Sequence, residues 1–208
     1  MNITTVHEPD FEPVTLLEVY NVLHVDPEGS PLEHPLDADF ARQITASRRN
    51  VEQQTRRSLI RQTLRLSMAD FPSPCGSVRA IRLHRPPVIM VESVAYYDAD
   101  NAQQTVSAAN YYLTDEQVPE LRFVLAFSAP TLYDRPDAVR VTYVAGYIGV
   151  GSPASTQAEA AEHVPAELKE AVLVGVQMLQ VATSPQDYEL LQRMQRAMLH
   201  PYIVQLAV

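Results

Sequence analysis

The chain has 208 residues, of which 46% are hydrophobic, and a formal net charge of -9 at pH 7. This apolar fraction can build a packed core, so the composition excludes an intrinsically disordered chain. A single cysteine, Cys75, excludes an intramolecular disulfide framework and favours a reducing compartment. The N-terminal sequence lacks the basic and apolar regions of a signal peptide, and no window approaches the roughly 18 apolar residues of a membrane span. We therefore expect a soluble protein that is not exported by a signal peptide and has no membrane partner.

Charged side chains are segregated along the chain. Residues 1–40 contain nine acidic residues and no Lys or Arg, whereas residues 41–65 contain seven arginines and one acidic residue. Such asymmetry is found in nucleic-acid surfaces, but the acidic total opposes tight phosphate binding. We favour instead a pairing of the acidic and arginine-rich segments, within a subunit or between neighbouring subunits. Arginine suits bidentate interface pairs, and the arginines that we assign to a subunit interface are Arg48, Arg49 and Arg56.

The first part of the chain has helical periodicity. Thr15 and Glu18 have the spacing of a capping box, and the apolar residues that follow recur at i, i+3, i+4 and i+7. After a proline-containing loop, we predict a second, amphipathic helix from Asp37 to about Arg57. Its buried face would contain Phe40, Ile44 and Val51.

Residues 59–147 have the alternating pattern of strands, with β-branched and aromatic runs between Pro, Asn and Asp breaks. We predict five to seven short strands, including a hairpin with its turn at residues 98–102. The predicted fold class is therefore α+β: a helical core, built from the N-terminal and C-terminal helices, with an inserted antiparallel β-sheet or small β-sandwich. The expected segments are an acidic arm with helices (1–58), the β-rich insertion (59–147), a flexible linker loop (148–164) and C-terminal helices with a docking tail (165–208).

The C-terminal part is helical again. A helix that begins near Pro165 continues into "AVLVGVQMLQVA", residues 171–182, which is apolar on nearly every side. A chain of this size rarely covers such a helix alone, so we assign Val172, Val176 and Leu179 to a subunit interface. A last helix is expected between Ser184, its N-cap, and His200, with an apolar stripe at Leu190, Leu191, Met194 and Met198. The residues that we assign to docking on a partner lie in the apolar, β-prone tail: Tyr202, Ile203, Val204 and Leu206.

No motif supports catalysis or cofactor binding. Gly146, Gly149 and Gly151 fit neither the dinucleotide nor the P-loop pattern. The six histidines are scattered, without the spacing of a zinc site, and no nucleophile-elbow sequence is present. We expect a protein that is not an enzyme, with no catalytic residues, no cofactor and no metal.

Several segments together resemble one family. In chain order they are "EPVTLLEVYNVLHVD", "EQQTRRSLIRQTLRL", "RPPVIMVESVAYYDADN", "AVRVTYVAGY" and "VPAELKEAVL", which span residues 12–182. This order is similar to that of the head-tail connector (adaptor) family of tailed bacteriophages and related gene transfer particles. The chain departs from the family in a longer loop between Tyr147 and Val164, and in "TRR" where Thr-Gly-Arg is more usual.

The resemblance implies a structural virion protein at the capsid-tail junction, assembled in the host cytoplasm. Members of the family form a homo-oligomeric ring, typically a dodecamer, beneath the portal protein. The ring extends the DNA channel, through which viral DNA passes without sequence-specific binding, and carries the downstream neck or tail-completion protein. The alternatives are another neck protein, a tail terminator or stopper, and a soluble binding module or enzyme. The last two require a pocket with convergent polar groups.

Overall fold

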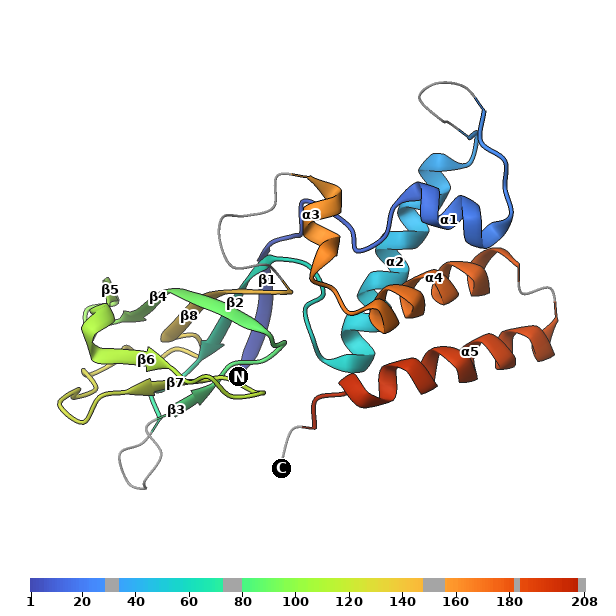
Figure 1. The fold of residues 1–208 in the computed structure, drawn as a ribbon. Coiled ribbons are helices and arrows are strands. Elements are labelled where there is room, and N and C mark those ends of the chain that lie inside the picture. Colours follow the sequence, from blue (N-terminus) through green and yellow to red (C-terminus); the bar gives the residue numbers. More distant parts are fainter. Residues whose placement is uncertain (29–33, 73–79, 148–155, 182–183, 206–208) are drawn as a thin grey trace. The chain divides into compact units, whose positions relative to one another are not determined.

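The computed structural model describes residues 1–28, 34–72, 80–147, 156–181 and 184–205. The chain divides into two compact units (Figure 1). The β unit consists of residues 1–9 and 61–146, and the helical unit of residues 10–60 and 147–208. Each unit has its own hydrophobic core. The predicted α+β class, with strands inserted between N-terminal and C-terminal helices, is confirmed.

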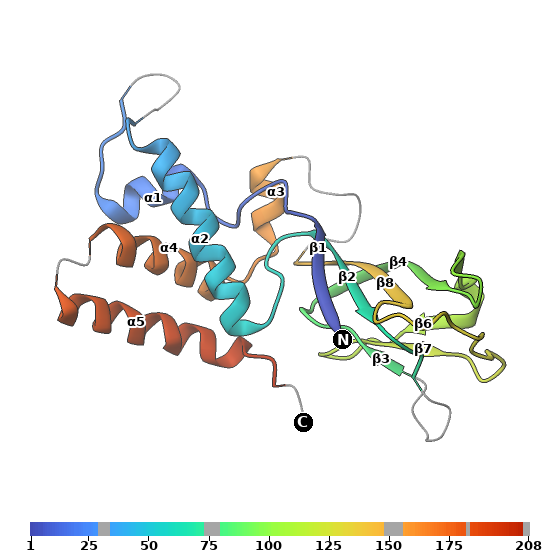
Figure 2. The same cartoon turned by 180° about the vertical axis from the view of Figure 1, so that it is seen from behind.

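The described part of the helical unit contains five α-helices. Both views show α4 lying between α1 and α5 (Figures 1 and 2). A short 3₁₀ helix, His200–Tyr202, follows the last α-helix. The bounds of the α-helices are α1 (Leu16–Leu23), α2 (Asp37–Thr55), α3 (Gln157–Glu162), α4 (Ala166–Gln180) and α5 (Pro185–Leu199).

The ends of these helices follow from local side-chain chemistry. The predicted capping box of α1 is confirmed: Thr15 Oγ1 accepts from the Glu18 amide, and Glu18 Oε2 accepts from the Thr15 amide. Ser184 caps α5 as predicted by accepting from the Asp187 amide. The second helix begins at Asp37, as predicted, and its C-cap is Arg56 in a left-handed conformation, with φ of 56°. Glycine is favoured at such a position, which accounts for the more usual Thr-Gly-Arg of the similar family.

The core of the helical unit forms where α1, α2, α4 and α5 meet. Phe40, Ile44 and Val51 are buried on α2, as their helical spacing predicts. Along α4 the packed positions include Leu168, Ala171, Val172 and Val176. The helical unit itself therefore covers much of the apolar surface of α4.

The described part of the β unit contains eight strands in two antiparallel sheets. The five-stranded sheet has the order β1-β2-β8-β4-β5 and the three-stranded sheet the order β3-β7-β6. Side chains from both sheets share one core, so the unit is a small sandwich. The bounds are β1 (Asn2–His7), β2 (Gln62–Met68), β3 (Ala80–Arg82), β4 (Val88–Tyr97), β5 (Gln103–Thr105), β6 (Tyr111–Leu113), β7 (Glu120–Phe123) and β8 (Val139–Ala145).

Two elements differ from the sequence-based expectation. The N-terminal arm contains strand β1, which pairs with β2 at the edge of the five-stranded sheet. The expected linker loop, residues 148–164, contains α3, because Thr156 caps the helix and Ala160 and Ala161 are buried against the unit. Residues 148–155 of that segment lie outside the described residues, as does Cys75.

Candidate functional site

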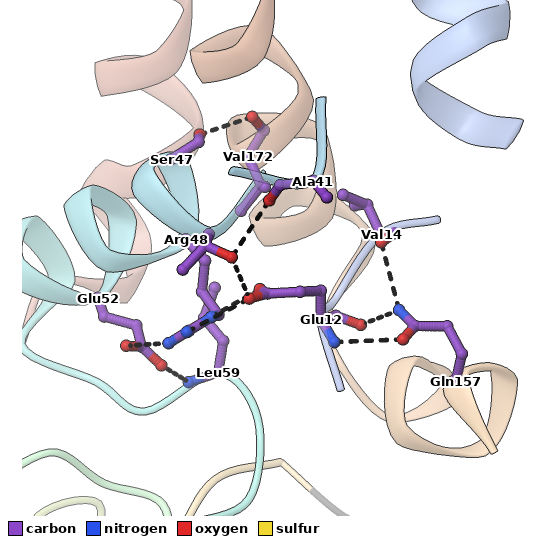
Figure 3. Close-up of polar contacts among 10 residues, drawn as sticks. Glu12, Val14, Ala41, Ser47, Arg48, Glu52, Leu59, Gln157 and Val172 are labelled. Carbon is purple, nitrogen blue, oxygen red and sulfur yellow. Dashed lines mark hydrogen bonds and ion pairs between the residues drawn. The ribbon is translucent and has the colours of Figure 1, made fainter. Parts of the chain in front are cut away.

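A buried ionic network joins the N-terminal acidic segment to α2. Arg48 Nε lies 2.7 Å from Glu12 Oε2, and Arg48 Nη1 lies 3.1 Å from Glu52 Oε2 (Figure 3). The side chains of Arg48 and Glu52 are 3% and 4% exposed, so this ion pair is shielded from solvent. Glu52 Oε1 also accepts a hydrogen bond of 2.9 Å from the Leu59 amide, which holds the chain where it leaves α2.

The same network reaches α3. The Gln157 side chain accepts from the Glu12 amide and donates to the main-chain oxygens of Glu12 and Val14 (Figure 3). Thr45 Oγ1 donates to Glu12 Oε1 at 2.8 Å. The predicted pairing of the acidic and arginine-rich segments is thus confirmed within the subunit for Glu12 and Arg48. This network has a structural role, because its polar groups form hydrogen bonds and ion pairs with one another.

The three arginines assigned to an interface lie in different environments. Arg48 is buried in the network just described, so its charge is neutralised inside the helical unit. Arg49 and Arg56 are exposed on α2 and at its C-terminal end. Their participation in a subunit interface stays a prediction, and the structure limits the surface available for it to Arg49 and Arg56.

The three α4 residues assigned to an interface also differ in burial. Val172 and Val176 are 0% and 1% exposed within the core of the helical unit, whereas Leu179 is 58% exposed. The Val172 main-chain oxygen accepts from Ser47 Oγ at 2.7 Å, and the Ala171 oxygen accepts from Gln195 Nε2 at 2.7 Å. Since α2 and α5 cover this part of α4, burial of the two valines requires no neighbouring subunit.

The apolar residues of α5 fall on two faces. Leu191 and Met198 are half-buried, and Gln195 and Leu199 are buried. A second set, Leu190 and Met194, is 60% and 43% exposed. The sequence predicts a single stripe here because it gives no sign of which apolar residues pack inward. The structure shows that the apolar arc is wider than the packing against α4 needs.

The C-terminal segment is held to the helical unit by main-chain contacts. The Val204 amide donates to the Thr55 oxygen at 3.0 Å, and Arg57 Nε donates to the Tyr202 oxygen at 2.7 Å. Tyr202 Oη donates to Glu167 Oε2 at 2.9 Å; burial and this carboxylate raise the pKa of Tyr202. Val204 is buried, while Ile203 is 43% exposed. Of the docking residues predicted from sequence, Tyr202 and Val204 are thus engaged internally, Ile203 is accessible, and Leu206 lies outside the described residues.

A charged cluster lies in the β unit, at the start of β8 and in the residues before it. Asp137 contacts two arginines, with distances of 2.6 Å to Arg135 Nε and 2.5 Å to Arg140 Nη2. Both guanidinium groups also lie over the Tyr97 ring, 3.9 and 4.8 Å from its centroid. Hydrogen bonds from Arg135 and Arg140 lower the pKa of Asp137 to about 2. These contacts hold the residues before β8 and at its start against Tyr97 of β4.

The described residues offer little for catalysis or metal binding. Among them, no group of three or more His, Cys, Asp or Glu side chains is placed to hold a metal ion. A pocket of about 330 Å³ in the β unit is lined by aromatic and small residues, including Phe71, Phe123 and Phe127, and its described lining contains no titratable side chain. No helix in the described ranges is long and apolar enough to cross a bilayer.

The architecture places the chain among α+β proteins in which one strand of a β-sandwich precedes the first helix and the other described strands lie between the second and third helices of a helical unit. No protein-family model matches the chain, and no curated protein matches its sequence. The fold, by contrast, is similar to chains in solved structures of one kind of particle over its whole length.

These solved structures are of the gene transfer agent (GTA) particle. A chain in the virion of the native particle has a TM-score of 0.73 and 17% identity, and the match covers 100% of this chain and 98% of that chain. A chain in the neck of the empty particle, computed with C6 symmetry, has a TM-score of 0.73 and 18% identity at the same coverage. A chain in the neck of the native particle, computed with C12 symmetry, has a TM-score of 0.68 and 18% identity, again with 100% and 98% coverage. The sequence resembles a family that includes proteins of gene transfer particles, and the fold is similar to chains of such particles as well.

Proposed function

We propose that the protein is a structural virion protein, a head-tail connector or adaptor that forms a ring beneath the portal. The observation that carries the proposal is the similarity in fold, over the full chain, to chains in the neck of the GTA particle. The ring extends the DNA channel and provides the platform to which the next neck or tail-completion protein attaches. In this role the protein is not an enzyme and uses no cofactor.

Symmetry supports a ring of many copies. The two neck structures with similar chains were computed with C6 and C12 symmetry, which is consistent with a dodecamer. A closed ring of identical subunits uses heterologous contacts, in which two different surfaces of each subunit meet. Arg49 and Arg56, the interface arginines that stay exposed, lie on one part of the surface that such a contact can use.

The net charge of -9 fits a channel that conducts DNA. Acidic side chains repel phosphate groups, so DNA that passes through the ring slides without sequence-specific binding. Binding at many phosphates would instead hold the DNA in the neck. The proposal thus places the protein at the capsid-tail junction after assembly in the host cytoplasm.

The C-terminal segment provides the contact with the portal. Tyr202 and Val204 anchor the segment on the helical unit, which leaves Ile203 exposed for the partner. An apolar, β-prone segment of this kind can bind by strand addition or by packing against helices. The anchored residues are part of the docking site because they fix where the segment leaves the helical unit.

The test is to mix the purified chain with the purified portal of the same particle and to measure the mass by light scattering. Electron micrographs then locate the chain in any complex. A ring of the chain on the tail-facing side of the portal is expected. A chain that ignores the portal and binds only tail-tube or stopper components would contradict the adaptor role in favour of a tail terminator or another neck protein.

A further inference from the structure

The outward face of α5 is apolar although nothing in the described chain covers it. Leu190 and Met194 are exposed, as is Ala197, and their i, i+4 and i+7 spacing places them along one line of the helix. This line, which we call the α5 stripe, lies away from Gln195 and Leu199, the residues that pack inward. Contiguous exposed apolar residues rimmed by charge mark interaction surfaces.

Charged side chains of both signs border the α5 stripe, and Asp187 and Glu189 are exposed beside it as well as the arginines. Arg193 pairs weakly with Glu189 on the same helix at 3.5 Å, with side chains 78% and 66% exposed. Arg196 is also exposed and forms no ion pair with the described residues. A partner for the stripe therefore needs an apolar centre and an acidic group that can lie opposite Arg196.

The side of the helical unit formed by α1 has these properties. Leu17 on α1 is 52% exposed, and residues 1–40 contain no Lys or Arg. Exposed acidic residues lie before and after α1, and Lys169, the nearby cation of α4, is paired with Glu18 at 3.8 Å. The exposed acidic residues that follow α1 within five residues in sequence are Asp26 and Glu28, and those on the adjoining helix α4 are Glu167 and Glu170.

The two surfaces are placed for a repeating contact. α4 contacts both α1 and α5, and both views show α1 and α5 on opposite sides of it (Figures 1 and 2). A subunit with complementary surfaces on opposite sides can bind one copy on each side, which is the requirement for a closed ring. A stripe-to-stripe contact between two copies is the isologous alternative.

We infer that the α5 stripe of one copy binds the α1 side of a second copy, with Leu17 against Leu190 and Met194. Arg193 and Arg196 face the acidic residues around α1. This contact rests on the proposed function, because it names the surfaces that join the subunits of the ring. It buries the exposed apolar residues of α5 and complements the charges of the two sides.

Charge variants at the two centres test the inference by light scattering and native mass spectrometry. Met194→Glu is expected to weaken self-association by at least about tenfold, since it loses the apolar contact and repels the acidic side. Met194→Lys loses the same contact but keeps an attractive charge, so its defect is smaller. At the α1 side, Leu17→Arg is expected to weaken self-association more than Leu17→Glu, because only the arginine is repelled by Arg193 and Arg196. Met90→Glu is the matched control, because Met90 is 49% exposed on β4 in the other unit and should assemble as the unmodified chain does.

Mixing the variants separates the heterologous contact from its alternatives. Met194→Glu lacks a working α5 stripe and Leu17→Arg lacks a working α1 side, so each alone stays monomeric. An equimolar mixture retains one unmodified contact between the two variants, and its other contact brings the introduced acidic and basic side chains together, so the mixture is expected to associate more strongly than either variant alone. Dimers of Leu17→Arg alone would indicate a stripe-to-stripe contact and overturn the inference.

The remaining outcomes separate this inference from the proposed function. Rings that form equally well with Met194→Glu or Leu17→Arg overturn the inference while leaving the adaptor role intact. An equal defect in Met90→Glu also overturns it, because the effect would not be specific to the surface. If the unmodified chain forms a ring only on the portal, the variants are compared on the portal, and an unaffected ring with Met194→Glu there overturns the inference alone. A chain that neither self-associates nor binds the portal overturns both. Circular dichroism of each variant confirms that it is folded.

Discussion

Gly175 of α4 lies so close to Ser47 of α2 that a β-carbon at position 175 would be 1.9 Å from Ser47 Oγ and 2.9 Å from Ser47 Cβ. Ser47 Oγ has little freedom to move because it donates to the Val172 oxygen in a buried site. Gln195 Nε2 of α5 would lie 3.2 Å from the same added atom. Glycine at this position therefore permits the close approach of three helices at the centre of the helical unit.

Gly175→Ala is expected to lower the free energy of unfolding of the helical unit. Overpacking a tight site costs about 1–3 kcal/mol, which exceeds the gain of about 0.5–1 kcal/mol that alanine provides over glycine in a helix. A urea titration followed by circular dichroism measures the difference. In a Ser47→Gly background the same change should be neutral or stabilising, because the contacting side chain is gone. A stabilised Gly175→Ala single variant would show that the helices can separate at little cost.

Arg48→Met should destabilise the helical unit by about 3–5 kcal/mol, because it removes a buried guanidinium group that pairs with Glu12 and Glu52. The side chain of Glu52 is 4% exposed, so water cannot replace the guanidinium group. Differential scanning calorimetry of the purified chain measures the effect. The double variant with Glu52→Gln should recover most of the loss, since the amide oxygen can still accept from the Leu59 amide. Equal losses in the single and double variants would argue against charge burial as the cause.

The cluster around Asp137 predicts a defined acid response. Hydrogen bonds from Arg135 and Arg140 lower the pKa of Asp137 from 3.8 to about 2. A carboxyl group whose pKa is lower in the folded state stabilises the fold above its unfolded pKa, and this contribution is lost as pH falls toward the folded value. The difference in stability between the unmodified chain and Asp137→Asn should therefore be constant near neutral pH and shrink between about pH 4 and pH 2. Chemical denaturation at a series of pH values measures this difference.

A matched change at the larger of the two contributors tests the cause. Arg135→Gln removes the main hydrogen-bonding cation and should move the pKa of Asp137 back toward its ordinary value. A carboxyl-carbon NMR titration measures that pKa directly. If the titration of Asp137 is unchanged in Arg135→Gln, the arginine does not hold the carboxylate as the geometry indicates.

The C-terminal segment gives a paired prediction. Val204→Ala should lower the free energy of unfolding by about 1–2 kcal/mol, because it removes buried apolar groups at about 0.8 kcal/mol each. Ile203→Ala should change stability by less than about 0.5 kcal/mol, since the side chain is exposed. Under the adaptor proposal, Ile203→Ala nevertheless weakens binding to the portal, which a pull-down with the portal ring measures. Unchanged portal binding after removal of residues 202–208 would contradict the docking role of this segment.

Local side-chain chemistry explains which elements could be predicted from sequence. Thr15 and Glu18 form a capping box whose members are three residues apart, and the turn after β4 is held by Asp98, whose Oδ1 accepts from the Asp100 and Ala102 amides. Both features depend on residues close in sequence. β1 lacks such a signal, because on this edge strand Ile3 is the only half-buried residue and no alternation of buried apolar residues appears. The sequence feature that still favours a strand here is the content of Ile, Thr and Val, which have high β-propensity. α3 could have been found from Thr156 and Glu159, which have the capping spacing, followed by alanines.

The covering of α4 shows where sequence reasoning ends. An apolar helix must be buried, but the pattern does not say whether its own chain or a neighbour covers it. α2 supplies Ser47 and α5 supplies Gln195 to the same turns of α4, and these contacts join residues more than a hundred positions apart or in separate helices. The α5 stripe could not be predicted for a related reason. Leu190 and Leu191 are the same residue type, and only tertiary packing makes Leu190 exposed and Leu191 half-buried.

The chain passes from the β unit to the helical unit and back before it returns to the helical unit once more. β8, near the end of the second β segment, occupies the middle of the five-stranded sheet between β2 and β4. During synthesis the five-stranded sheet therefore cannot be completed until residue 145 has left the ribosome. α2 can pack against α4 and α5 only later, when those helices have been synthesised. Neither unit can be cut out as one continuous piece: a fragment of residues 61–146 would lack β1 and leave the edge of β2 open to pairing with another chain.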